Sequence, residues 1–78
     1  MRTIDCTVAF PSKRTLTLRT GLYYEIDLKD NQFYMGKLHS FCIDGNTLEH
    51  LTLAFPGGKR LLIFGKDIDS IRRSYVHP

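Results

Sequence analysis

Apolar and polar residues alternate along most of the chain with a period of two. In residues 3–10 the even positions are apolar and the odd positions are polar or small. Between Leu16 and Leu28 the even positions again hold most of the apolar side chains, on both sides of Gly21. Such alternation is typical of strands that bury one face. It predicts an N-terminal strand and then one long strand over residues 16–28, bent locally at the glycine.

Turn-forming residues divide the rest of the chain into short segments. Asp30-Asn31 predicts a two-residue turn, Asp44-Gly45-Asn46 a loop, and Pro56-Gly57-Gly58 a further turn. The alternation also shifts at Gly36, as it does at a bulge or sharp bend. We therefore expect further strands at residues 32–43, 51–55, 61–64 and 68–71.

The number and length of these segments predict the fold class. No window of 11 residues carries a helical stripe, and five or six short, bent strands indicate an all-β domain. We expect a strongly bent, five-stranded antiparallel open barrel over residues 15–73, with an extension strand in residues 1–14 and a tail in residues 74–78. The predicted core consists of Leu28, Phe33, Leu38, Phe41, Leu53, Ile63, Ile68 and Ile71.

Composition limits the kind of protein that this sequence can encode. Its 78 residues suffice for one domain, and no apolar run approaches the roughly 18 residues of a membrane-spanning helix. The first residues lack an apolar stretch of signal-peptide length, so we expect a cytoplasmic protein. Cys6 and Cys42 are expected to be buried thiols, and neither they nor the histidines have the spacing of a metal site. No pair of residues is spaced as a nucleophile and base, so neither catalysis nor a cofactor is expected.

Charge and size indicate the kind of partner. The formal net charge is +3, with the basic surplus in residues 1–20 and 72–78 and an acidic surplus in residues 21–71. Basic flanks occur in proteins that bind polyanions, and also as ordinary solvated charges. A core of this size rarely supplies more than about 3 to 5 kcal/mol, and such chains often gain stability by self-association. We therefore expect a homo-oligomer.

Two segments carry a family resemblance. The first runs from Ile26 to Phe41, with Leu28-Lys-Asp-Asn31 followed by Phe33, Gly36, Leu38 and Phe41, and the second runs from Leu62 to Ile71 around Phe64-Gly65. In order and spacing they resemble the two motifs of Sm and Sm-like (LSm) proteins. In that family a strand ending in Leu-x-Asp-Gly or Leu-x-Asp-Asn precedes one that carries an apolar residue, a glycine, a leucine and a phenylalanine. The second motif is usually Ile-Arg-Gly, followed by two spaced apolar residues.

The resemblance implies a function as well as a fold. Members of the family pair their edge strands into rings of about five to seven subunits, which bind single-stranded RNA without catalysis. For this chain the resemblance implies a homo-oligomeric ring that binds U- or A-rich RNA. The positions that it assigns to RNA binding are Asp44, Asn46, His50, Phe64, Gly65 and Lys66.

The chain also departs from the family pattern. Cys42 stands where the family usually has an aspartate, and Phe64 replaces the arginine before the glycine. The loop over residues 43–50 is expected to be lengthened. Asn46 matches the family's asparagine by direct count, whereas His50 matches it if the loop contains an insertion, and the sequence leaves both alternatives open. The family's N-terminal helix is replaced by the predicted strand in residues 1–14.

Each candidate residue also has a purely structural interpretation. Phe64 lies in an apolar strand and could serve packing, Asn46 could be only a turn residue, and His50 and Lys66 could be surface residues. Two other functions therefore stay open beside RNA binding. One is a ring of the same fold that serves as a protein-assembly scaffold, and the other is a monomeric binding module of the Tudor or OB type.

Overall fold

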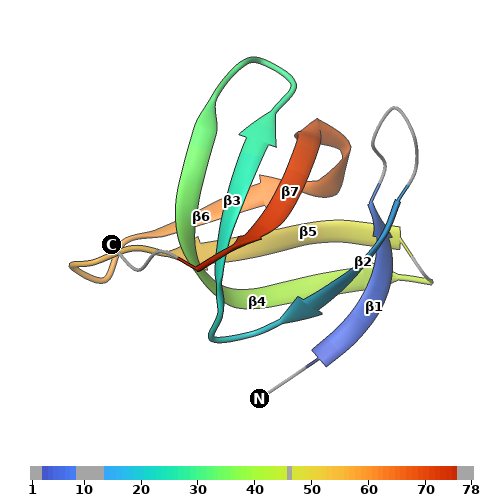
Figure 1. The fold of residues 1–78 in the computed structure, drawn as a ribbon, viewed down its shortest axis with the longest axis horizontal. Helices are drawn as coiled ribbons and strands as arrows, with labels where there is room; N and C mark the ends of the chain where they lie inside the picture. The colour runs from blue at the N-terminus through green and yellow to red at the C-terminus, as the bar shows by residue number, and fades with distance from the viewer. Residues whose placement is uncertain (1–2, 9–13, 46, 76–78) are drawn as a thin grey trace.

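The computed structural model describes residues 3–8, 14–45 and 47–75 and is built almost entirely of strands (Figure 1). The elements are β1 (Thr3–Val8), β2 (Arg14–Arg19), β3 (Tyr23–Leu28), β4 (Phe33–Asp44), β5 (Thr47–Ala54), β6 (Arg60–Phe64), the 3₁₀ turn η1 (Gly65–Asp67) and β7 (Ile68–Ser74). No α-helix occurs in these ranges, which confirms the predicted all-β class.

Strands β3 to β7 form the expected five-stranded antiparallel sheet. Their order is β6-β5-β4-β3-β7, so β6 and β7 are its two ends. The long strand β4 changes partner along its length, since Phe33–Lys37 pair with β3 and Lys37–Asp44 pair with β5. Figure 1 shows β4 curving from one partner to the other, so that β3 and β7 cross the direction of β5. No pairing joins β6 to β7 among the described residues, and the sheet is therefore open.

The N-terminal part of the chain forms a hairpin. β1 pairs antiparallel with β2 along its whole length and meets β5 through one parallel bridge between Thr7 and Thr47. The prediction of a single strand over residues 16–28 is wrong, because it is divided into β2 and β3. Gly21 has a φ of 90°, which glycine adopts without strain, and it reverses the chain between the two strands. β2 begins at Arg14, so the hairpin includes residues on both sides of the predicted boundary between the N-terminal extension (1–14) and the barrel (15–73).

Most of the predicted core is buried. The core cluster comprises Leu18, Tyr24, Ile26, Leu38, Phe41, Leu48, Leu51, Leu53, Ile63, Ile68 and Ile71. Leu28 is only partly buried against it. Phe33 was also predicted to lie in the core. That prediction is wrong, because its side chain is 51% exposed.

The error at Phe33 follows from where β4 changes register. The alternation of β4 shifts between Leu38 and Ser40 rather than at Gly36, so the even positions of its first half face inward. Gly36 is itself buried, and a Cβ there would lie 3.0 Å from Phe55 Cε1. The glycine is therefore needed for close packing and not for a bulge.

The predicted turns are found where the glycines and asparagine require them. Asn31 has a φ of 70°, and its backbone N–H donates a hydrogen bond to the Leu28 carbonyl over 3.1 Å. Gly57 and Gly58 have φ values of 89° and 85° and connect β5 to β6. These left-handed conformations are the ones that glycine and asparagine tolerate best.

Candidate functional site

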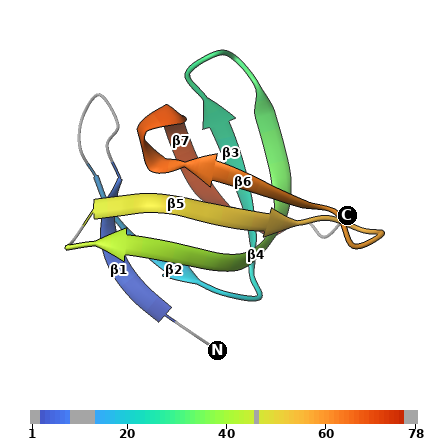
Figure 2. The same ribbon diagram turned by 180° about the vertical axis from the view of Figure 1, so that it is seen from behind.

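The ends of three neighbouring strands meet at one end of the sheet. β5 lies between β4 and β6 (Figure 2), and His50 of β5 is opposite both Cys42 of β4 and Phe64 of β6. Their sequence neighbours Phe41, Leu51 and Ile63 belong to the core. Because successive side chains of a strand point to opposite faces, Cys42, His50 and Phe64 point outward. Three residues that are far apart in sequence thus share one outer face.

A bulge in β5 adds a fourth side chain to this face. Cys42 pairs with His50 and Ile43 pairs with Leu48, which leaves Glu49 without a partner on β4. A bulge re-aims a side chain that would otherwise point to the opposite face. Glu49 and His50 are therefore in contact although they are adjacent in a strand, with 3.3 Å between Glu49 Oε1 and His50 Nδ1.

Phe64 presents a partly exposed aromatic ring beside a cation. Its side chain is 45% exposed, and the His50 ring approaches it edge-on with 6.4 Å between ring centroids. The ammonium of Lys66 lies 6.0 Å from the centroid of the same ring. A ring held in this way offers a flat apolar surface for stacking, and the nearby ammonium can interact with it or with a bound anion.

Gly65 allows η1 to approach the backbone of β5. A Cβ at this position would overlap the carbonyl oxygen of Leu48, so any side chain would force the two segments apart. Since Phe64 and Lys66 flank this glycine, the close approach fixes both of them over the start of β5. Gly65 is buried and takes no direct part in the exposed surface.

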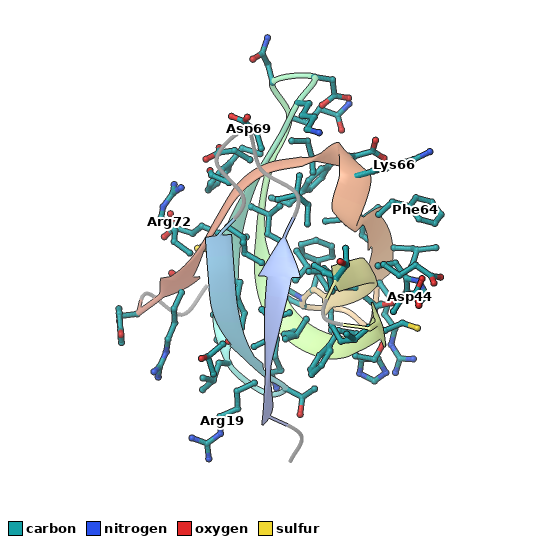
Figure 3. The ribbon with its side chains drawn as sticks, turned by 90° about the vertical axis from the view of Figure 1, so that its right-hand side faces the viewer. Arg19, Asp44, Phe64, Lys66, Asp69 and Arg72 are labelled. Carbon is teal, nitrogen blue, oxygen red and sulfur yellow. The ribbon has the colours of Figure 1, made fainter. Side chains whose placement is uncertain are left out.

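These residues surround a groove of about 510 Å³, lined by Asp44, Thr47, Leu48, Glu49, Phe64 and Lys66. Figure 3 shows Asp44, Phe64 and Lys66 on the same side of the molecule, with Arg72 on the other side. The lining contains two carboxylates and one ammonium, so the groove is not a cationic phosphate site. Its open, partly apolar form fits a flat group better than a phosphate.

The structure brings together most of the residues that the sequence singled out. Asp44, Phe64 and Lys66 line the groove, His50 contacts Phe64, and Gly65 lies beneath. Asn46 lies outside the described residues. Phe64 is 45% exposed, so it does not pack in the core of the single chain, whereas packing at an interface stays open.

The sequence missed the contributions of Cys42, Thr47, Leu48 and Glu49. The region expected as a lengthened loop over residues 43–50 is instead the tip of a long hairpin, in which Asp44 pairs with Thr47. The expectation of an unpaired loop is wrong, because β4 continues to Asp44 and β5 begins at Thr47. Gly45, with a φ of 63°, was the signal for such a tight turn.

The basic residues of the C-terminal segment lie away from the groove and already have partners. Arg72 of β7 forms ion pairs with Glu25 over 2.9 Å and Asp27 over 3.0 Å, both on β3. Hydrogen bonds from Ser70 and Arg72 lower the pKa of Asp27, and the bond to Asp27 raises that of Arg72. Arg73 packs over the ring of Tyr75, with its guanidinium carbon 4.7 Å from the centroid. Phosphate binding by Arg72 would have to compete with two carboxylates.

Comparison of the chain with protein-family models, with curated protein sequences and with solved structures gave no match. Among the described residues, no helix has the length and apolar character required to cross a membrane.

Proposed function

We propose that this protein is a small ring-forming protein that resembles the Sm-like family and binds single-stranded RNA without catalysis. The observation that carries the proposal is the gathering of Asp44, His50, Phe64 and Lys66 around one groove. These residues come from β4, β5, β6 and η1 and were selected only by their positions in the two sequence motifs. A binding site requires that residues from different parts of the chain meet at one surface, as these four residues do.

The groove suits a base better than a phosphate. Single-stranded RNA is recognised by stacking of bases on aromatic rings and by hydrogen bonds to base edges. Phe64 supplies the ring, and the carboxylates of Asp44 and Glu49 can accept hydrogen bonds from exocyclic amino groups. Adenine carries such an amino group, whereas uracil offers only its ring N3–H as a donor, so this lining favours the A-rich alternative.

The two end strands of the antiparallel sheet, β6 and β7, are an argument for the proposed ring. β6 and β7 each pair on one side only among the described strands, and edge strands of this kind are templates for pairing with another copy. Leu62 on β6 is 51% exposed, which leaves an apolar side chain at this edge. A head-to-tail contact between β6 of one copy and β7 of the next repeats until it closes a ring. We propose that the sheet is the bent open barrel of the Sm-like fold, with the β1–β2 hairpin in place of the family's helix.

The hairpin register also favours one of the two alternative alignments. Cys42 stands at the position of the family's aspartate, and its cross-strand partner is His50. This pairing supports the alignment in which the hairpin carries an insertion and His50 takes the position of the family's asparagine. Under this alignment the polar pair of the family is replaced by a thiol and an imidazole.

RNA binding can be tested by fluorescence anisotropy with labelled oligo-A and oligo-U at two salt concentrations. We expect binding that weakens with salt and prefers oligo-A. Phe64→Ala should weaken it by about 1 to 3 kcal/mol, the usual contribution of stacking on an aromatic side chain. Phe33→Ala is the matched control, because Phe33 has a similar exposure, 51% against 45%, and does not line the groove.

A second candidate function is a protein-assembly ring without an RNA site. The surplus of carboxylates in the groove and the presence of Phe64 in place of an arginine favour it. No RNA binding at micromolar protein and low salt, together with an intact ring, would reject RNA binding and favour this alternative.

A further inference from the structure

Cys42, Glu49 and His50, which point outward near the β5 bulge, offer three different kinds of metal ligand. The thiol of Cys42, a carboxylate oxygen of Glu49 and a ring nitrogen of His50 all lie within 4.8 Å of one another. They come from two adjacent strands whose register is fixed by the pairing of Cys42 with His50. No single sequence motif contains all three, which explains why spacing along the chain gave no indication of a metal site.

The distance between the Glu49 and His50 ligand atoms matches that between two ligands of a tetrahedral zinc ion. Two nitrogen or oxygen ligands at about 2.0–2.1 Å from a tetrahedral zinc ion lie roughly 3.3–3.4 Å apart. Glu49 Oε1 and His50 Nδ1 are 3.3 Å apart. A sulfur ligand at about 2.3 Å from the metal lies roughly 3.5 Å from its neighbours. The Cys42 thiol already lies within 4.8 Å of the other two ligand atoms.

The donor set also indicates which metal would be preferred. A thiolate and an imidazole favour zinc over magnesium or calcium, which take oxygen ligands. The site is accessible, since the side chains of His50 and Glu49 are 32% and 55% exposed. The same Glu49–His50 contact could also be a simple ion pair of a protonated imidazole, but an ion pair does not account for a free thiol within reach of both groups.

We propose that Cys42, Glu49 and His50 bind a zinc ion on the outer face of the β4–β5 hairpin. Three protein ligands leave one position for water or for another ligand. Because Glu49 also lines the groove, that ligand can come from a molecule bound there. The site goes beyond the proposed RNA binding and does not depend on it.

The test uses the full chain in reducing buffer without RNA, with zinc chloride competing against a chromophoric chelator. We expect one zinc ion per chain, no competition from excess magnesium chloride, and at least tenfold weaker binding by Cys42→Ser and His50→Ala. Two matched controls should keep the wild-type affinity: Cys6→Ser removes the other cysteine of the sequence, and His39→Ala removes an exposed histidine that is not part of the cluster. Cobalt chloride should give a thiolate-to-metal charge-transfer band with wild type and not with Cys42→Ser.

A separate variant covers the case in which Cys42→Ser disturbs folding. Glu49→Gln replaces an exposed side chain at the unpaired bulge position, so it should fold, bind zinc more weakly and keep the cobalt–thiolate band. Absence of zinc binding by the wild type at submillimolar zinc would overturn the proposal and leave the Glu49–His50 ion pair as the only role of this contact. Equal affinities of wild type, Cys42→Ser and His50→Ala would overturn it as well. RNA binding measured in the presence of a chelator separates a failure of this site from a failure of the proposed function.

Discussion

Gly65 shows how one residue positions the groove without lining it. The sequence marked it only through its place in a family motif, whereas the structure gives a physical reason. Its Cα lies against the Leu48 carbonyl, so that η1 and the start of β5 are in direct backbone contact. The neighbouring Phe64 and Lys66 owe their positions over the groove to this contact.

Replacement of Gly65 by alanine should therefore be costly. The added methyl group overlaps the Leu48 carbonyl, which belongs to the backbone and has little freedom to move. We expect Gly65→Ala to lower the free energy of unfolding by about 1 to 3 kcal/mol, the usual cost of overpacking. Urea denaturation measures this change as a lower midpoint at an unchanged slope.

Gly36→Ala provides a graded comparison in the same experiment. Its Cβ would be 3.0 Å from Phe55 Cε1 and 3.1 Å from the Ala54 carbonyl oxygen, a tighter fit than usual but less severe than at Gly65. We expect a smaller loss than for Gly65→Ala. Equal stability of Gly65→Ala and the wild type would show that η1 can move away from β5 freely.

Single residues also show where prediction from the sequence stops. Asp44, His50, Phe64, Gly65 and Lys66 were recognisable because they occupy motif positions. Glu49 was not, because its outward direction results from a bulge that depends on the pairing of β4 with β5. A period of two predicts the face of a residue only while the register stays constant.

At the scale of elements, the pairing of β3 with β7 is reinforced by a charged cluster. Asp27 accepts hydrogen bonds from Ser70 Oγ over 2.8 Å and from Arg72 Nη1 over 3.0 Å. Arg72 also donates to Glu25 on the same strand as Asp27. The partners lie more than 40 residues apart in sequence, so these bonds stabilise a long-range contact of the fold.

The lowered pKa of Asp27 predicts how stability depends on pH. Since the pKa of Asp27 in the folded chain lies below its ordinary value of 3.8, the ionised carboxylate stabilises the fold above that pH. This contribution is lost as the pH falls through the folded pKa. Asp27→Asn should therefore be less stable than the wild type at neutral pH, and the difference should shrink in acid.

Urea denaturation of both proteins across this pH range measures the effect. Asp69→Asn removes the same charge from an exposed position on β7, where Asp69 forms no ion pair with any described residue. It should show a weaker pH-dependent difference than Asp27→Asn. A difference for Asp27→Asn that stays constant from neutral to acid pH would contradict the assigned role of the carboxylate.

A buried tyrosine connects the β1–β2 hairpin to the sheet. The side chain of Tyr24 on β3 is 2% exposed, and its hydroxyl accepts a hydrogen bond from the Arg19 amide at the end of β2 over 3.0 Å. Tyr24→Phe keeps the ring and removes this bond, so we expect a loss of about 0.5 to 1.5 kcal/mol in thermal or urea denaturation.

Tyr34→Phe is the control for this substitution. The Tyr34 hydroxyl donates to Gln32 Oε1 over 2.7 Å in an exposed setting, where water can replace the partner. Its removal should change stability little. If the two variants are equally stable, the Tyr24 bond does not contribute to the docking of the hairpin.

The elements were more predictable than their boundaries. Alternation and turn residues located β4 to β7 within a few residues, because strand formation and turn chemistry are local. The division of residues 16–28 was missed because its parity is unchanged across Gly21. Parity does not distinguish one bent strand from two strands that bury the same side, and the distinction depends on which partner each strand meets.

At the scale of the whole molecule, the end strands β6 and β7 of the five-stranded antiparallel sheet each have a partner on one side only among the described residues. The order β6-β5-β4-β3-β7 places the last two strands of the chain at opposite ends of the antiparallel sheet. Alternation could not reveal this order, because a sequence pattern gives the faces of strands and not their neighbours. The arrangement makes self-association a specific expectation that involves β6 and β7.

If the chain forms the proposed ring, native mass spectrometry of the intact protein should detect about five to seven copies of the 9.0-kDa chain, the ring size that the resemblance to Sm-like proteins implies. Leu62→Glu adds a charge to an exposed position on edge strand β6, where apolar contact with another copy is expected. Because this side chain is outside the core, the variant should keep its fold, measured by circular dichroism, while its mass falls toward that of one chain. Phe33→Glu introduces the same charge at an equally exposed position that is on neither edge strand, and it should leave the assembly intact. A wild-type mass of 9.0 kDa would reject the ring, whereas equal dissociation by both variants would show that association does not run through β6.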